Sequence, residues 1–233
     1  MSENKTGKYL KYAIGEVMLV MIGILLALQV NNWNEGRKLK IVEVKMLENI
    51  NANLIATKEN LSRVMRINKN TLEDTQLIQN VIENDLPYSK SLDSAFASIE
   101  VWESPHFTYT VYESLKSKGI DIISNDSIKN EITFIFEVLF TTLVDDYDKI
   151  EWAIYESVVY PTVSKFLYNY GRSVNRRRVL SRPNNFEELK NSDEFLNMLG
   201  MIIRNRQFGL RVSTMLDQTL SNLIEMIDKE LKK

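Results

Sequence analysis

The sequence contains no cysteine and a single histidine, His106, in 233 residues. Without thiolates the chain can form no disulfide, no thiolate zinc site and no iron–sulfur cluster, and it offers no cysteine nucleophile. One histidine excludes metal sites built from several histidines and leaves little for a Ser-His-Asp triad. We therefore expect a protein that is not an enzyme and holds no cofactor or metal.

Glycine and proline are also scarce, with eight and four residues, or about 5% of the chain against roughly 12% in average proteins. Few chain breakers mean few tight turns, which argues against an all-β sandwich and against a glycine-rich nucleotide-binding fold. The charges almost balance, at 29 basic and 31 acidic residues, so we expect no nucleic acid partner.

A long apolar run near the N-terminus is the most informative segment. Val17–Trp33 contains 17 consecutive uncharged residues. A helix of that length spans about 25 Å, and a membrane-spanning helix needs about 17–25 residues. Tyr9 and Tyr12 before the run and Trp33 at its end are side chains typical of a membrane interface. We predict an N-terminal tail, a transmembrane anchor and a separate domain, at residues 1–12, 13–33 and 37–233.

Two other interpretations of the run remain open. A signal peptide is disfavoured because the run is long and no small-residue cleavage site follows it. A buried helix of a soluble core is the other alternative. Lysines flank the run on both sides, so the positive-inside rule gives no clear direction. A short tail before a large domain favours an anchor whose N-terminus lies in the cytoplasm.

One face of the anchor carries a charge and small residues. Glu16, Gly23 and Ala27 fall on one helical stripe at steps of three and four. Gly23 and Ala27 form a pair that lets two helices approach closely, and a lipid-facing Glu16 would cost about 2–3 kcal/mol. We expect this stripe to drive self-association. The alternative is that Glu16 reaches the headgroups and Gly23 is incidental.

Two stretches carry a resemblance to a known family. Ser2–Glu35 (SENKTGKYLKYAIGEVMLVMIGILLALQVNNWNE) resembles the N-terminal signature of an uncharacterised family of single-span membrane proteins from Bacteroidota, and Tyr112–Ile132 (YESLKSKGIDIISNDSIKNEI) is similar to its second recurring segment. The chain has fewer basic residues at its extreme N-terminus than that family usually has. The resemblance implies an inner-membrane protein with its domain outside the cytoplasm, in the periplasm, and it brings no known catalytic residues.

A helical pattern without glycine or proline follows, from Arg37 to about Asp85. Its heptad positions form an apolar stripe, the seam, which allows a two-stranded coiled coil. Four of the eleven seam positions are polar, and this favours a long edge helix of a bundle instead. Leu47, Leu54, Leu61, Asn68, Thr75 and Ile82 fall seven apart, and Ile50, Thr57, Val64, Thr71 and Ile78 each follow by three.

The rest of the chain also has helical spacing, and no alternating strand pattern persists. We therefore predict an all-α fold, an antiparallel bundle in which the long first and last helices pair. In the last helix, Leu196, Ile203, Leu210, Asp217, Ile224 and Leu231 are spaced by seven, with Leu199, Leu220 and Ile227 on the same face. Further helices are predicted at residues 91–99, 110–118, 126–160, 161–170 and 192–231, with an irregular segment at 171–191.

Three groups of side chains are candidate sites. Asp145, Asp146, Asp148 and Glu151 suit a solvated helix face better than a metal site. Trp102, His106, Phe107, Tyr109 and Tyr112 suit the cap of a bundle better than a ligand pocket. Five arginines could dock an anionic partner or a lipid headgroup, although a solvated basic loop is the simpler interpretation. These are Arg172, Arg176, Arg177, Arg178 and Arg182.

Together these features favour a membrane-anchored interaction or assembly protein with an extracytoplasmic helical domain. Its expected partners are the lipid bilayer and either further copies of itself or another membrane protein. An extracytoplasmic ligand sensor is the alternative, and it would need a separate transducing partner because no second span returns the chain to the cytoplasm. A hydrolase is the weakest hypothesis.

Overall fold

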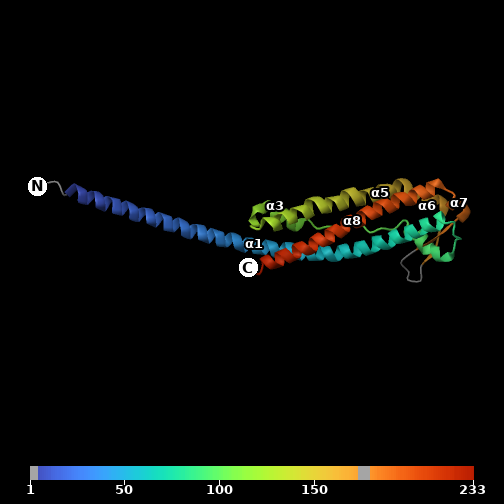
Figure 1. The fold of residues 1–233 in the computed structure, drawn as a ribbon, viewed down its shortest axis with the longest axis horizontal. Coiled ribbons are helices and arrows are strands. Elements are labelled where there is room, and N and C mark those ends of the chain that lie inside the picture. Colours follow the sequence, from blue (N-terminus) through green and yellow to red (C-terminus); the bar gives the residue numbers. More distant parts are fainter. Residues whose placement is uncertain (1–4, 173–178) are drawn as a thin grey trace.

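The structure is a computed structural model that describes residues 5–172 and 179–233. About 82% of the chain is helical, so the all-α class is confirmed apart from one small two-stranded sheet. The first helix, α1 (Lys5–Glu83), and the last long helix, α8 (Asp193–Glu230), are the two longest elements. Figure 1 shows the N-terminal half of α1 projecting alone from the packed remainder of the molecule.

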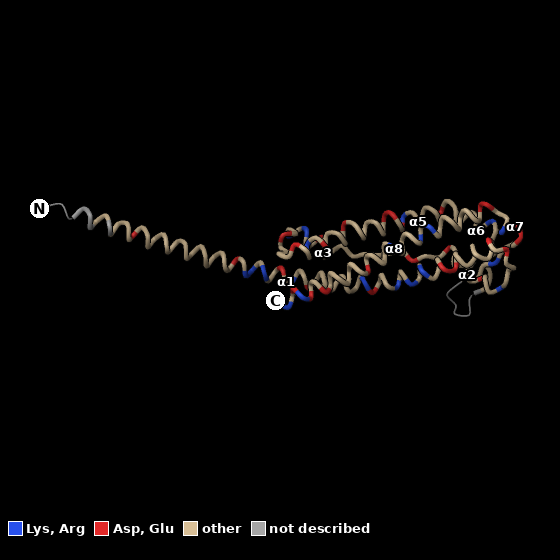
Figure 2. Tube along the Cα trace, in the orientation of Figure 1, with Lys and Arg blue, Asp and Glu red and all other residues tan. Residues whose placement is uncertain are grey.

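The helix α1 is continuous over 79 residues, or about 120 Å. It runs through Asn31–Asn34 without a break, so the two helical segments expected on either side of these residues are one rod. Between Val17 and Val30 every side chain is exposed. Charged residues are sparse in this half and frequent in the packed half (Figure 2).

The second half of α1 is packed. All eleven positions of the predicted seam are buried. They are covered within the same chain, largely by α8. Asn51 Nδ2 donates to Asp228 Oδ1 at 2.8 Å, and Lys58 Nζ lies 2.8 Å from Asp217 Oδ1. Because later residues of α1 meet earlier residues of α8, the two helices are antiparallel. A second chain, as in a two-stranded coiled coil, is not needed to bury the seam.

A third row of helices lies on the other side of α8 (Figure 1). The chain first forms the short helix α2 (Asp93–Ser98), which packs on α1. The third row then consists of α3 (Thr110–Lys118), α4 (Asp126–Thr133), α5 (Lys149–Ile154) and α6 (Tyr160–Phe166). Wider π-type turns join α4, α5 and α6 into one helical path. Pro161 does not break this path; it stands where the π-type turn Tyr155–Val159 passes into α6.

The prediction that no strand occurs is wrong. The helix expected to reach Tyr170 ends at Phe166, and β1 (Leu167–Arg172) pairs antiparallel with β2 (Val179–Pro183). A tertiary contact holds this hairpin: the buried carboxylate of Asp93 accepts hydrogen bonds from the hydroxyls of Tyr88 and Tyr170. The segment predicted as irregular also contains a short helix, α7 (Phe186–Lys190).

A buried ion pair separates two apolar clusters of the core. Arg206 Nε lies 2.8 Å from Glu151 Oε1, and the two side chains are 1% and 3% exposed. The guanidinium also donates to the Ile99 carbonyl at 2.8 Å, and Asn205 donates to the other Glu151 oxygen at 2.6 Å. The prediction that Glu151 belongs to a solvated face is therefore wrong, whereas Asp145 and Asp146 are exposed.

Candidate functional site at the junction of α1 and the domain

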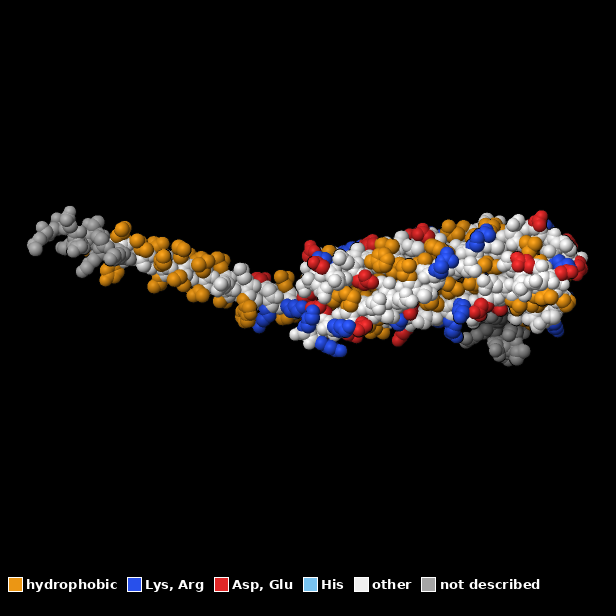
Figure 3. Space-filling view, viewed as in Figure 1, with side chains coloured by type: hydrophobic (Ala, Val, Ile, Leu, Met, Phe, Trp, Pro, Cys, Tyr) orange, Lys and Arg blue, Asp and Glu red, His pale blue; other side chains and the backbone are white. Residues whose placement is uncertain are grey.

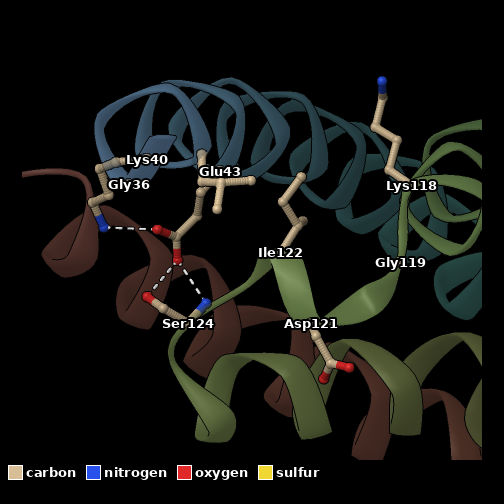
Figure 4. Close-up of a pocket in the computed structure, with 9 residues that line it drawn as sticks. Gly36, Lys40, Glu43, Lys118, Gly119, Asp121, Ile122 and Ser124 are labelled. Carbon is tan, nitrogen blue, oxygen red and sulfur yellow. Dashed lines mark hydrogen bonds and ion pairs between the residues drawn. The ribbon is translucent and has the colours of Figure 1, made fainter. Parts of the chain in front are cut away.

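A hollow of about 460 Å³ lies where α1 enters the packed domain (Figure 4). One wall comes from α1, and the opposite wall is the turn between α3 and α4. The lining residues are Gly36, Leu39, Lys40 and Glu43 from α1, and Lys118, Gly119, Asp121, Ile122 and Ser124 from the turn. We call this region the junction.

The local sequence explains the turn. Gly119 follows the last residue of α3 with a φ of +93°, a conformation that side chains with a Cβ rarely adopt. A single short turn, Ile120–Ile122, then leads to Asn125. The Asn125 side chain accepts from the backbone amides of Ser127 and Ile128 and so starts α4, as the Ser124-Asn125-Asp126 pattern predicts.

Glu43 joins α1 to this turn. Its carboxylate, 3% exposed, accepts from the Ser124 amide at 2.7 Å, from the Ser124 hydroxyl at 2.6 Å and from Lys40 Nζ at 2.9 Å. Burial raises the pKa of Glu43, but the hydrogen bonds from Ser124 and Lys40 outweigh it, so the pKa lies below its ordinary value of 4.5. The charged form of Glu43 therefore fastens the turn to α1.

The end of α8 is fastened to the same turn. Asn125 Nδ2 donates to Glu230 Oε2 at 2.8 Å, while its Oδ1 caps α4. The hydrogen bonds from Asn125 and Lys233 lower the pKa of Glu230. Thus two polar side chains of one turn hold α1, α4 and α8 together at the end of the domain nearest the projecting half of α1.

The predicted anchor residues lie outside the junction, on the projecting half of α1. Glu16, Gly23 and Ala27 are exposed, and a Cβ added at Gly23 would meet nothing within 4 Å. Tyr9, Tyr12 and Trp33 are also exposed, and the Arg37 guanidinium lies 5.9 Å from the centroid of the Trp33 ring. Gly36, in the junction, follows Trp33 by only three residues.

The projecting stretch meets the length and composition needed for a membrane span. Within the residues that the structure describes, α1 is the one helix long and apolar enough, and none of its apolar stretch is buried. An N-terminal signal sequence can have the same length and composition.

Of the five predicted arginines, the structure describes two, and both lie on the hairpin rather than at the junction. Arg176, Arg177 and Arg178 lie outside the described residues, and Arg172 ends β1. The Arg182 guanidinium, in β2, lies 5.4 Å and 5.3 Å from the rings of Tyr168 and Tyr170. Across residues 5–172 and 179–233, no group of three acidic or histidine side chains could hold a metal ion.

Sequence reasoning missed the role of Glu43 and the ion pair of Glu151 with Arg206. Glu43 precedes the seam position Leu47 by one helical turn, which is the only signal of its burial. The sequence predicted that α4 starts at Asn125. It did not predict the hydrogen bond from Asn125 to Glu230, because partners 105 residues apart leave no local pattern.

Comparison with known proteins gives a family but no activity. Residues 16–203 match the model of a family described as Family of unknown function (DUF6090). No curated protein and no solved structure matches the chain. The matched residues include the apolar stretch of α1 from Glu16 onward and the whole turn between α3 and α4.

Proposed function

We propose that this chain, which belongs to the DUF6090 family of unknown function, is a membrane-anchored interaction or assembly protein without enzymatic activity. One observation carries the proposal: α1 passes unbroken from a stretch exposed on all sides into a seam buried by its own domain. A bilayer is the solvent that suits the first stretch, since a helix satisfies its own backbone there.

The anchor is residues 13–33, and the protein crosses the inner membrane once. The domain is an antiparallel helical bundle on the extracytoplasmic side, in the periplasm. The resemblance of Ser2–Glu35 to single-span proteins from Bacteroidota supports this location. The three helical rows that pack side by side support the bundle.

The junction would hold the bundle in a fixed position above the bilayer. Glu43 follows Trp33 by ten residues, or about 15 Å of helix. Because α1 runs unbroken from the span into the bundle, no flexible linker separates the two, and Glu43 and Asn125 tie the turn to α1 and α8. Such an arrangement suits a protein that presents a surface at a set height to other membrane proteins or to its own copies.

A ligand sensor that acts through a separate partner is the second candidate. The hollow at the junction favours it, because a molecule bound there would contact both α1 and the turn. A thermal shift of several degrees with one member of a metabolite panel, absent in a variant with Ile122→Trp, would support this candidate over the first.

Two measurements test the proposed location. The full chain should stay in the membrane after alkaline carbonate extraction, whereas a chain lacking residues 1–36 should be soluble and helical. Alkaline phosphatase fused after Lys233 should be active, and green fluorescent protein at the same place should be dark. Release of the full chain by carbonate, or a fluorescent fusion with silent phosphatase, would contradict the location.

A third measurement tests the function. Tagged protein purified in mild detergent should bring down a membrane protein, or further copies of itself, in a fixed ratio. The chain lacking residues 1–36 serves as the control for contacts made through the span. A monomer without companions under these conditions would contradict the proposal.

A further inference from the structure

The helical path from α4 to α6 has an exposed face that carries large apolar side chains. Phe134, Val138, Trp152 and Tyr160 are 39%, 46%, 48% and 59% exposed. They share one stripe at steps of three and four with Thr141, Asp145, Lys149 and Glu156, all exposed or half-buried. Tryptophan and tyrosine on such a surface are typical of residues that carry binding energy. We call this face the outer stripe.

On another side of the molecule, α1 and α8 form an open groove of about 700 Å³. Met65 and Leu210 give it an apolar floor, and Arg66 and Lys69 stand on its rim. Within the described residues Arg66 makes no ion pair, and Lys69 has only a loose one with Glu73 at 3.8 Å. Figure 3 shows one side of the domain, where apolar side chains lie among charged ones.

The outer stripe and the groove lie at the same level along the molecule. Asn68 Nδ2 on α1 donates to the Tyr147 hydroxyl at 3.2 Å. Both helical paths lead away from the junction, since Glu43 contacts Ser124 at their start. With equal rise per residue, Arg66 is therefore level with Asp145.

Among the described residues, the charged side chains that form no ion pair have opposite signs on the two surfaces. Glu156 on the outer stripe and Asp146 beside it have no ion-pair partner within the described residues. Arg66 and Lys69 border the groove, where Glu73 makes the loose pair with Lys69. We propose that the occupant is a second copy of this chain: the outer stripe of one copy docks in the α1–α8 groove of its neighbour. Opposite charges at the rim would guide the orientation of this contact.

Membrane anchoring makes this geometry possible, and in this respect the inference rests on the proposed function. Copies in one bilayer stand parallel, so surfaces that meet must lie at the same height, as these two do. The stripe and the groove are different surfaces, and the contact is therefore heterologous. Repeated about an axis normal to the membrane, such a contact builds an assembly of several copies, which is a ring where the rotation closes.

Cysteine cross-linking of the full chain in native membranes tests the inference, because the natural chain has no cysteine. Asn70→Cys lies in the groove and Ala153→Cys lies beside Trp152 in the outer stripe. A bismaleimide should give a ladder of oligomers with the double variant and a dimer when the two single variants are co-expressed. Each single variant alone should stay monomeric. Strong dimers from either single variant would overturn the heterologous contact.

Charge reversal sharpens the test. Arg66→Glu or Asp146→Arg should lower the cross-linked fraction roughly three- to tenfold, and the two together should restore it. Lys118→Glu, an equal charge change at the junction, should leave it unchanged. An unchanged fraction with Arg66→Glu would overturn the inference.

The cross-linking result can be told apart from the result that tests the membrane anchor. Carbonate extraction of the same membranes reports the anchor alone. Protein that resists extraction but gives no ladder with the double variant would overturn only the docking of copies. Protein that is extracted would contradict the anchor, whatever the cross-linking shows.

Discussion

The two halves of α1 use similar apolar residues in opposite ways. Between Val17 and Val30 the apolar side chains surround the helix and are all exposed. Between Leu47 and Ile82 most of them form one stripe, which α8 and its neighbours bury, and of the large ones only Ile55 and Leu77 are exposed. A ring of apolar side chains suits a bilayer and a stripe suits a protein core. One unbroken helix therefore passes through two environments, one suited to a bilayer and one inside a protein core. The same substitution should have different effects in the two halves.

The largest effect should come from the buried ion pair, which has no counterpart in the projecting half. Arg206→Ala leaves the Glu151 carboxylate buried without its cation. We expect a loss of about 3–5 kcal/mol in the free energy of unfolding, measured by urea unfolding of the full chain in detergent. The double variant Glu151→Met with Arg206→Met should recover most of the loss. A loss below about 1 kcal/mol for Arg206→Ala would show that water reaches the pair.

The same change in the two halves compares them directly. Leu54→Ala removes a fully buried side chain and should cost about 2–5 kcal/mol. Leu25→Ala, in the exposed stretch, should leave the unfolding of the domain unchanged within error. Equal losses for both variants would mean that the projecting half belongs to the core.

Glycines give a second matched pair. A Cβ at Gly209 would lie 2.5 Å from the ring of Tyr147, whereas one at Gly23 would meet nothing within 4 Å. Gly209→Ala should therefore cost about 1–3 kcal/mol because the ring must move. Gly23→Ala should not affect the domain. If Gly209→Ala were neutral, the close contact between α8 and Tyr147 would be wrong.

The smallest effect concerns pH at the junction between the halves. Because the folded pKa of Glu43 lies below 4.5, its stabilising contribution is complete above about pH 4.5 and is lost as the pH falls through the folded pKa. At neutral pH, Glu43→Gln should be less stable than the natural chain by about 1 kcal/mol or less. The two unfolding curves should converge in acid. A difference that grows as the pH falls would reverse the assigned sign.

The buried half of α1 could be predicted from the sequence because its partners cover a narrow stripe. The face of α8 could be predicted only in part: Leu199, Leu220 and Ile227 are buried as expected. Of the six positions spaced by seven, only Ile203 is buried. The other five are half-buried: Leu196, Leu210, Asp217, Ile224 and Leu231. The helix contacts both α1 and the third row, so its buried face is wider than a two-helix seam. It includes Met198, Ile202, Leu216 and Leu223.

The hairpin and the polar contacts depend on partners far apart in the sequence. The strand LYNYGR has weak alternation, and its Tyr170 is held by Asp93, 77 residues away. The Glu151–Arg206 pair spans 55 residues. Local patterns predict where α4 begins at Asn125, but only the folded chain shows that Asn125 also binds Glu230.

The distance across the boundary between the two halves tests the central claim most directly. Spin labels at Val30→Cys and Glu48→Cys lie 18 residues apart, or five turns on the same face of one helix. In the full chain reconstituted into lipid nanodiscs, electron–electron double resonance should give one narrow distribution near about 27 Å. A broad distribution or a clearly shorter distance would mean a hinge between span and domain, and would contradict the continuous helix on which the account depends.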